Sequence, residues 1–215
     1  MSIKVKPIEL KIPKGMHDIL PVEQKYWERI RRAVREISAF YGFERIDTPI
    51  VEATDLFVRS VGEETDIVTK ELYSFKTKGG DDLTLRPEGT AGVVRAYLEH
   101  GMGSLPQPVK FSYVGPMFRH ENPQRGRYRQ LWQFGFEVVG DGDPVIDVQI
   151  MQVLSVIAAE VGLKNVLFRV NSIGCAACRP QHRKALVQFY RSKTARLCTD
   201  CRRRIKTNPL RVFDC

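Results

Sequence analysis

Two runs of alternating apolar residues, joined by an arginine-rich loop, constrain the fold of this chain more than any other feature. They occupy residues 110–140 and read KFSYVGPMFRHENPQRGRYRQLWQFGFEVVG. Successive side chains of a β-strand point to opposite faces, so this alternation is typical of strands that pack on one side. Two such runs with a polar segment between them predict an antiparallel hairpin.

The two faces of the predicted hairpin differ in chemistry. A register with Arg119 opposite Gln133 also places Gly115 opposite Glu137. One face then carries four polar side chains, Arg119, Glu121, Gln133 and Glu137. The other carries Val114, Phe118, Trp132, Phe134, Phe136 and Val138. Because glycines between the polar groups leave room beside the strands, we interpret the first face as the floor of a binding site and the second as a packing surface.

Other segments show helical or strand patterns. Apolar residues recur at helical spacing in residues 22–41 and 145–161, and a further helix is predicted at residues 91–100. Gly42 is expected to end the first helix and Thr90 to cap the second. Strands are predicted at residues 43–51, 72–76, 83–86 and 166–170, with the second and third paired as a hairpin. Pro49 lacks a backbone N–H, which favours an edge strand or an interface.

Composition sets limits on the kind of protein. A chain of 215 residues with 43% apolar content can bury one core, or one domain with an appendage. The net charge of +9 favours a polyanionic partner such as a nucleotide or RNA, although a basic surface that only aids solubility is an alternative. The sequence has no long apolar run and no apolar signal-peptide core, so we expect a cytoplasmic protein without a membrane partner.

The C-terminal part of the chain has a different character. From about Gly174 onward the sequence is rich in Cys and Arg, so we predict two domains, residues 1–172 and 173–215. Two CxxC pairs have the spacing of a four-thiolate zinc site, with candidate ligands Cys175, Cys178, Cys198 and Cys201. The alternative is that these are reduced thiols without a metal.

The hairpin also carries a family resemblance. Phe118, Arg119, His120 and Glu121, with the basic loop and the returning strand, resemble motif 2 of class II aminoacyl-tRNA synthetases. The sequence FRHENPQRGRYRQ is similar to motif 2 of the histidyl-tRNA synthetase family in particular. Three further segments resemble the same family: KGMHDILP at residues 14–21, TLRPEGT at residues 84–90, and the helix and Pro49 segment, which resembles motif 1. The resemblance implies an α+β fold, an antiparallel sheet flanked by helices, that is incomplete at its C-terminus because motif 3 does not occur in the sequence.

The resemblance implies a role for each polar residue of the nucleotide site. Arg119 would be the catalytic group, bridging the histidine carboxylate and the α-phosphate of ATP. Glu121 would read the adenine amino group and Arg127 would hold the triphosphate, with Mg²⁺ accompanying ATP. Leu131 would cover the purine where the family commonly has phenylalanine. Without the resemblance, Arg119 is equally well explained by a salt bridge to Glu121.

Histidine recognition is implied for a second set of residues. Glu137 would accept a proton from the imidazole, because a carboxylate is an acceptor and the ring offers an N–H. Glu88, Thr90 and Gln133 would hold the α-ammonium group. Glu88 directly precedes a predicted helix, so a carboxylate that interacts with the helix N-terminus is an alternative compatible with that role.

We consider three functions and favour the first, which the resemblance implies; the other two are alternatives. The first is part of a histidine–tRNA ligase that uses ATP and tRNA(His), with little activity as an isolated fragment. It would be a homodimer through residues 22–51, although the helix in that range would pack equally well on its own core. The second is a non-catalytic, histidine-binding regulator of a biosynthetic enzyme. The third is a zinc-stabilised RNA-binding fragment.

Overall fold

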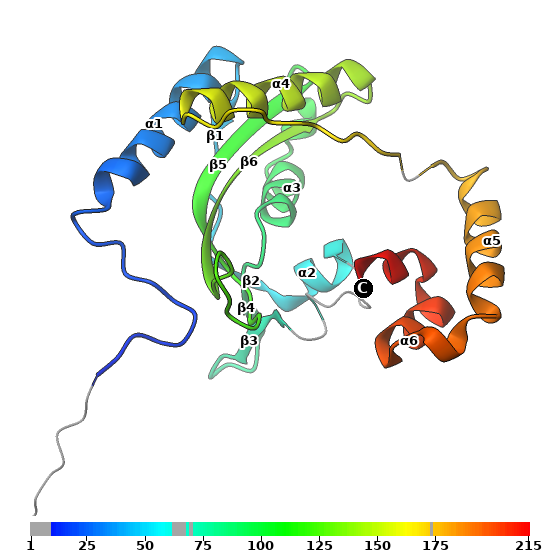
Figure 1. Ribbon diagram of the computed structural model, residues 1–215. Coiled ribbons are helices and arrows are strands. Elements are labelled where there is room, and N and C mark those ends of the chain that lie inside the picture. The colour runs from blue at the N-terminus through cyan, green and yellow to red at the C-terminus, as the bar shows by residue number, and fades with distance from the viewer. Residues whose placement is uncertain (1–9, 62–67, 69–70, 173) are drawn as a thin grey trace, which may run out of the picture. The chain divides into compact units, whose positions relative to one another are not determined.

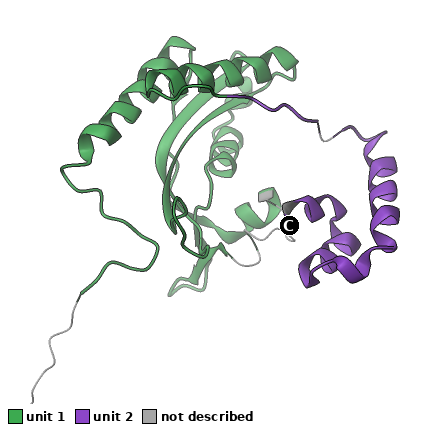
Figure 2. Cartoon of the chain, in the orientation of Figure 1, with its two compact units in different colours: residues 1–166 green, residues 167–215 purple. Residues whose placement is uncertain are grey.

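The computed structural model describes residues 10–61, 68, 71–172 and 174–215. These residues form two compact units, residues 1–166 and residues 167–215 (Figure 2). The division falls after Val166, whereas the sequence analysis placed it after residue 172. Within the described residues, no helix is long and apolar enough to cross a membrane.

The main sheet of the first unit has the strand order β1-β5-β6. Strands β5 (Val109–Phe118) and β6 (Gln130–Val139) form the predicted antiparallel hairpin, and β1 (Glu44–Arg45) adds to β5 in parallel. The predicted register is wrong, because Gln133 pairs with Gly115 and not with Arg119. Strand β5 ends at Phe118, so Arg119 and Glu121 belong to a connection that is longer than the sequence pattern suggested. The displacement is an even number of residues, which keeps the side chains of the two strands on their predicted faces.

Helices cover both faces of this sheet (Figure 1). Helices α1 (Gln24–Phe40) and α4 (Pro144–Glu160) pack on one face around Val34, Val153 and Ile157. The predicted packing surface lies there, since this core includes Val114, Phe134, Phe136 and Val138. Helix α3 (Thr90–Glu99) covers part of the other face, where Val93 packs with Phe111, Tyr113 and Met117. The predicted binding floor is therefore part core and part polar.

A second sheet has the order β2-β4-β3 and precedes α3. Strands β3 (Tyr73–Lys76) and β4 (Asp82–Leu85) form the predicted hairpin, and β2 (Val51–Ala53) pairs with β4. The single strand predicted at residues 43–51 is wrong: it is divided into β1 and β2, which belong to different sheets. Pro49 lies in the break, where its missing N–H prevents a continuous ladder. Helix α2 (Thr54–Val61) follows β2 and buries Phe57.

Two helix ends follow the sequence signals. Gly42 has a left-handed φ of 73° just after α1, a conformation that costs glycine little. At the start of α4, the Asp143 carboxylate accepts a hydrogen bond from the Val145 N–H at 2.9 Å, and Pro144 occupies the first helical position.

Side chains of the protein itself occupy the space above the two glycines of the floor, Gly115 and Gly135. A Cβ on Gly135 would overlap the Tyr113 ring, and a Cβ on Gly115 would overlap the Arg86 guanidinium. The interpretation that these glycines leave room for a ligand is therefore wrong at both positions. They allow Tyr113 and Arg86 to lie flat against the sheet.

Gly135→Ala should therefore destabilise the first unit. The added methyl group must displace the Tyr113 ring, and forced overpacking of this kind costs about 1–3 kcal/mol of unfolding free energy. Urea unfolding followed by tryptophan fluorescence measures the effect. Gly142→Ala is the matched control, because a Cβ there meets no atom within 4 Å. Equal stability of the two variants would contradict the contact.

The second unit is small and helical. It contains α5 (Arg179–Arg191), α6 (Thr199–Thr207) and the 3-10 helices η3 (Thr194–Arg196) and η4 (Pro209–Asp214). The strand predicted at residues 166–170 is wrong, since these residues have no regular structure. No described strand pairs with them, and Leu167 and Val170 are about three-quarters exposed (74% and 75%). An apolar run of this kind needs a neighbouring strand to become one.

Candidate active site

The segment that joins β4 to α3 brings the predicted site residues together. The Arg119 Nε donates a hydrogen bond to the Pro87 carbonyl at 2.8 Å. The Thr90 hydroxyl donates to the Glu137 carboxylate at 2.7 Å. Pro87 and Thr90 are three residues apart, so Arg119 and Glu137 both contact this short segment from the same side of the hairpin. The guanidinium and the carboxylate therefore face a common region, as the sequence analysis requires.

Glu137 is half-buried on the floor. Besides Thr90, the Tyr113 hydroxyl donates to its Oε1 at 3.3 Å. Burial raises the pKa of the Glu137 carboxyl, and the hydrogen bonds from Thr90 and Tyr113 offset part of this effect. Burial also raises the pKa of Tyr113 to about 12, with a smaller contribution from the neighbouring Glu137 charge. Tyr113 is therefore a neutral donor that orients Glu137.

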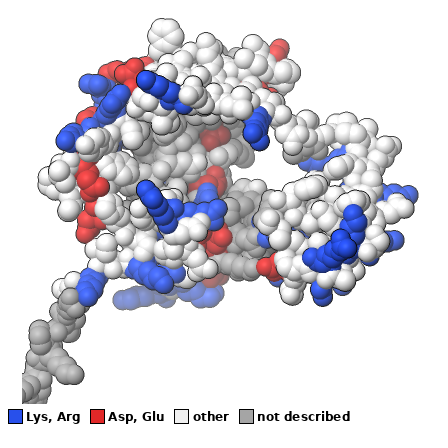
Figure 3. Space-filling model, in the orientation of Figure 1, with Lys and Arg blue, Asp and Glu red and all other residues white. Residues whose placement is uncertain are grey.

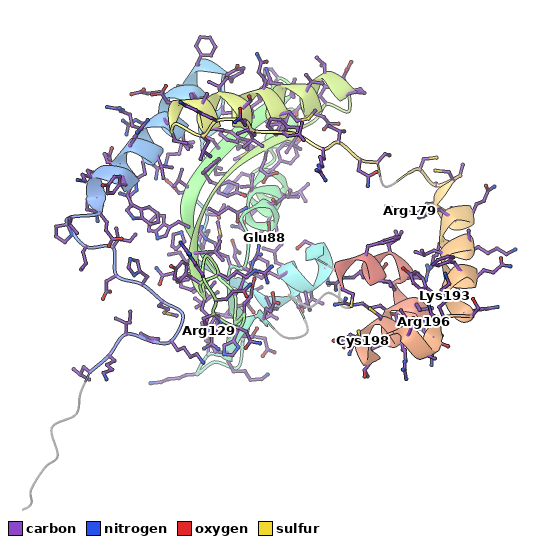
Figure 4. All side chains as sticks on the ribbon, in the orientation of Figure 1. Glu88, Arg129, Arg179, Lys193, Arg196 and Cys198 are labelled. Atoms are coloured by element: carbon purple, nitrogen blue, oxygen red, sulfur yellow. The ribbon has the colours of Figure 1, made fainter. Side chains whose placement is uncertain are left out.

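Glu88 is the carboxylate at the N-terminus of α3 (labelled in Figure 4). It accepts hydrogen bonds from the backbone N–H groups of Thr90 at 2.6 Å and Ala91 at 2.9 Å. The helix-terminus interpretation of Glu88 is thus confirmed. The prediction that Thr90 caps the helix is wrong, because Thr90 is the first helical residue and its hydroxyl is directed to Glu137. Glu88 and Thr90 also line an open groove of about 830 Å³ between α2 and α3.

Gln133 has an acceptor without a partner. Its Oε1 is buried and makes no hydrogen bond to any described residue. Such an atom normally has a hydrogen-bond partner, since burying a polar group without one costs about 1–3 kcal/mol of folding free energy. Gln133 and Glu137 lie on the same face of β6, about 13 Å apart along the strand. A ligand that donates hydrogen bonds at both ends can bind between them.

Three of the predicted nucleotide residues, Arg119, Glu121 and Arg127, form a charged group in the connection between β5 and β6. Glu121 is largely buried and lies 3.9 Å from the Arg119 Nη1 and 3.5 Å from the Arg127 Nη1. The salt bridge between Arg119 and Glu121 is thus present, but its N–O distance is near the upper limit for an ion pair. The hydrogen bond to the Pro87 carbonyl fixes the orientation of the guanidinium. Arg127 is 65% exposed and projects from the loop. An exposed guanidinium can move to a phosphate at low cost.

Two neighbours of this group have structural roles. Leu131 pairs with Met117 and packs against the core under α3. Arg129, labelled in Figure 4, ties the loop to the N-terminal arm, since its N–H donates to the Gly15 carbonyl at 2.6 Å and its Nε to the Glu121 carbonyl at 3.2 Å.

Sequence reasoning missed two residues of the site. Tyr113 lies on the floor beside Glu137, and the alternation of the strand predicts that face for it. Its aromatic ring made it look like core. Arg86 is buried, and its guanidinium donates to the carbonyls of Thr48 at 2.8 Å and Pro116 at 3.0 Å. Burial lowers its pKa. Arg86 thus joins the segment before β2 to strand β5, an arrangement that no local pattern indicates.

The cysteines form two groups in the second unit. Cys175 and Cys178 precede α5, with their Sγ atoms 3.7 Å apart. Cys198, Cys201 and Cys215 form a separate group near α6, with Sγ atoms within 4.8 Å of one another. Neither Cys175 nor Cys178 belongs to this group. The four candidate ligands are thus divided, and Cys215 accompanies the second pair.

Comparison with solved structures defines the class of protein. The chain aligns with apo histidyl-tRNA synthetase of S. aureus with a TM-score of 0.75 and 40% identity, over 95% of this chain and 48% of that one. The fold therefore matches part of the core of a class II aminoacyl-tRNA synthetase. A Bacillus halodurans structure, described as an ATP phosphoribosyltransferase regulatory subunit/histidyl-tRNA synthetase, shares the fold with a TM-score of 0.66 and 22% identity, over 94% of this chain and 55% of that one.

Sequence comparison narrows this class to one family. The model of the histidyl-tRNA synthetase family matches residues 15–196, and the chain belongs to that family. It is 53% identical to the histidine–tRNA ligase of Trichlorobacter lovleyi over 94% of this chain and 48% of the relative. The corresponding protein of Desulfitobacterium hafniense is 49% identical, with the same coverage of both chains. The chain spans about half the length of the curated relatives it matches.

Proposed function

We propose that this chain is the histidine- and ATP-binding part of a histidine–tRNA ligase. The parent reaction joins histidine to AMP and then transfers the histidyl group to tRNA(His). The observation that carries the proposal is the shared contact of Arg119 and Glu137 with residues 87–90. It supports a single site with a cation for the reacting carboxylate and phosphate and an anion for the substrate side chain.

Glu137 is proposed to select histidine through the imidazole N–H. The hydrogen bonds from Thr90 and Tyr113 hold the carboxylate in position and leave its second oxygen to accept a hydrogen bond from the ring N–H. Gln133 supplies a buried acceptor for the α-ammonium group, and Glu88 and Thr90 contribute from the start of α3. These groups would orient histidine with its carboxylate toward Arg119.

Arg119 is proposed to be the catalytic residue of adenylate formation. A carboxylate oxygen of histidine attacks the α-phosphorus, the bond to the bridging oxygen breaks, and pyrophosphate leaves. The two reactants are both anions, so a fixed guanidinium between them lowers the cost of their approach. Anchoring of Nε at Pro87 supports this role, because it sets the orientation before substrates bind.

The nucleotide is proposed to lie along Glu121, Arg127 and Leu131. Glu121 would accept from the adenine amino group, Leu131 would contact the purine, and Arg127 would pair with the outer phosphates. Magnesium would enter bound to the triphosphate, whose oxygens are the ligands that this hard cation prefers. The chain itself contributes Arg127, whose exposure lets it reach that complex.

Two partners are proposed: tRNA(His), from the charge of the second unit, and a second copy of the chain, from exposed apolar side chains of α1. The second unit holds twelve Lys and Arg residues against two Asp, whereas the first holds 22 basic and 23 acidic residues. The second unit thus carries the net positive charge, and Figure 3 shows Lys and Arg on one face of it, which supports contacts with tRNA(His) in the cytoplasm. Helix α1 packs on its own core through Val34 and also exposes Tyr26 and Phe40, which supports a homodimer through residues 22–51.

Calorimetry with L-histidine and with ATP, each titrated alone, tests the proposal. Both should bind, and ATP binding should be stronger with histidine present. Because the chain spans about half of its relatives' length, it should give little histidine-dependent ATP–pyrophosphate exchange. Histidine binding without any nucleotide binding would favour the regulatory alternative. Failure of both ligands to bind would contradict the proposal.

A further inference from the structure

The cysteine cluster of the second unit lies apart from the chemistry proposed above. Cys198 directly precedes α6, Cys201 lies in its first turn, and Cys215 follows η4. Their three Sγ atoms lie within 4.8 Å of one another, and all three cysteines are free thiols. Cys198 is labelled in Figure 4, where the yellow sulfur atoms gather beside α6.

One sulfur–sulfur distance of the cluster matches that of a metal–thiolate centre. Zinc binds thiolate sulfur at about 2.3 Å in tetrahedral geometry, so two sulfurs that share one zinc ion lie about 3.8 Å apart. The Sγ atoms of Cys198 and Cys215 are 3.8 Å apart. The Cys201 N–H donates to the Cys198 Sγ at 3.4 Å, the kind of second contact that orients a metal-bound sulfur.

The packing of the unit gives an independent reason for a cross-link at this place. Its core consists of Cys201, Ile205 and Val212, with Val187, Tyr190 and Leu197 packed against it. A core this small rarely supplies more than about 3–5 kcal/mol, and natural domains of this size commonly add a metal or disulfides. Cys201 is 1% exposed and lies inside that core, so a bond to its sulfur joins the core directly to both ends of the α6–η4 segment.

We propose that Cys198, Cys201 and Cys215 form a binding site for zinc, with the fourth coordination position taken by a ligand other than these three. The ion would connect the start of α6 to the end of η4 and stabilise the second unit. The site differs from the four-thiolate arrangement that the sequence spacing suggests, because Cys215 replaces the Cys175–Cys178 pair. It is independent of histidine and ATP binding.

Titration of the reduced, metal-free chain with cobalt(II) tests the proposal. Tetrahedral thiolate coordination should give visible absorption and near-ultraviolet sulfur-to-cobalt bands that saturate at one equivalent, and zinc should then abolish them. Cys198→Ser and Cys215→Ser should each lose this absorption. Both side chains are exposed, so circular dichroism of the variants should match that of the metal-free parent.

The matched control is the double variant Cys175→Ser/Cys178→Ser, which should retain the absorption that zinc displaces. Zinc should also raise the unfolding temperature of the parent and of this control, but not that of Cys215→Ser. The proposal is overturned if the reduced parent gives no cobalt absorption. It is equally overturned if the control loses the absorption, since the ligands would then include the first pair.

Discussion

Glu137→Gln should weaken histidine binding by about 10- to 100-fold, because hydrogen bonds to a charged group contribute about 1.5–3 kcal/mol. The amide keeps the size of the side chain and can still accept from Thr90 and Tyr113. It replaces the charged acceptor for the imidazole with a neutral group that carries its own N–H donors. Calorimetric titration with L-histidine at neutral pH measures the loss.

The same variant should be more resistant to urea than the parent at pH 7. Burial raises the pKa of Glu137 in the folded chain above its usual value of 4.5. The folded state therefore favours the protonated carboxyl. The resulting stability is fully present below pH 4.5 and is lost as the pH rises through the raised pKa. Gln does not titrate, so the advantage of the variant should be present at neutral pH and absent near pH 4.

Glu44→Gln is the matched control for both effects. Glu44 is an exposed carboxylate in β1, and its removal changes the net charge by the same amount. It should leave histidine affinity and urea stability unchanged. A Glu137→Gln variant that binds histidine as the parent does would remove Glu137 from the recognition site, whatever its stability.

Arg119→Gln should lower the affinity for a non-hydrolysable histidyl-adenylate analogue by about 30-fold or more. Loss of one partner of a buried, hydrogen-bonded charge pair costs about 2 kcal/mol or more. The analogue presents the carboxyl-derived group and the phosphate-derived group together, which is the arrangement that a guanidinium can bridge. Competition against a fluorescent form of the analogue measures the affinity.

Two further variants separate this role from a structural one. Arg119→Lys keeps the charge but not the planar fork, so it should recover only part of the affinity. Arg125→Gln changes an exposed arginine of the same loop and should have no effect, since the analogue lacks the outer phosphates. If Arg119→Gln lowers urea stability but not affinity, then the hydrogen bond to Pro87 is the whole function of the side chain.

Local periodicity predicts much of this fold and little of its long-range detail. The hairpin of β5 and β6, its two faces and the helices α1, α3 and α4 follow from spacing alone. The register does not, because it depends on the Arg119–Arg129 connection, which is held by Gly15 of the N-terminal arm. The failed strand at residues 166–170 has a related cause: strand formation requires a partner that the apolar pattern does not identify.

In the candidate site, too, local patterns predict part of the arrangement and long-range contacts determine the rest. Alternation correctly places Gln133 and Glu137 on one face, and the motif resemblance selects Glu88 and Thr90. Neither predicts that Tyr113 fills the space beside Gly135 or that Thr90 donates to Glu137. These contacts join residues far apart in the sequence, and they become visible only when α3 packs on the sheet. The grouping of the cysteines also depends on structure, since Cys215 lies beside Cys198 and Cys201 although the CxxC spacing does not include it.

The central claim is that one surface of the hairpin holds an activated histidine between Arg119 and Glu137. Calorimetric comparison of histidyl- and alanyl-adenylate analogues tests it most directly, because the two ligands differ only in the imidazole. The histidyl analogue should bind one molecule per chain and at least tenfold more tightly than the alanyl analogue, with the difference abolished in Glu137→Gln. Equal affinity of the parent chain for both ligands would contradict the account.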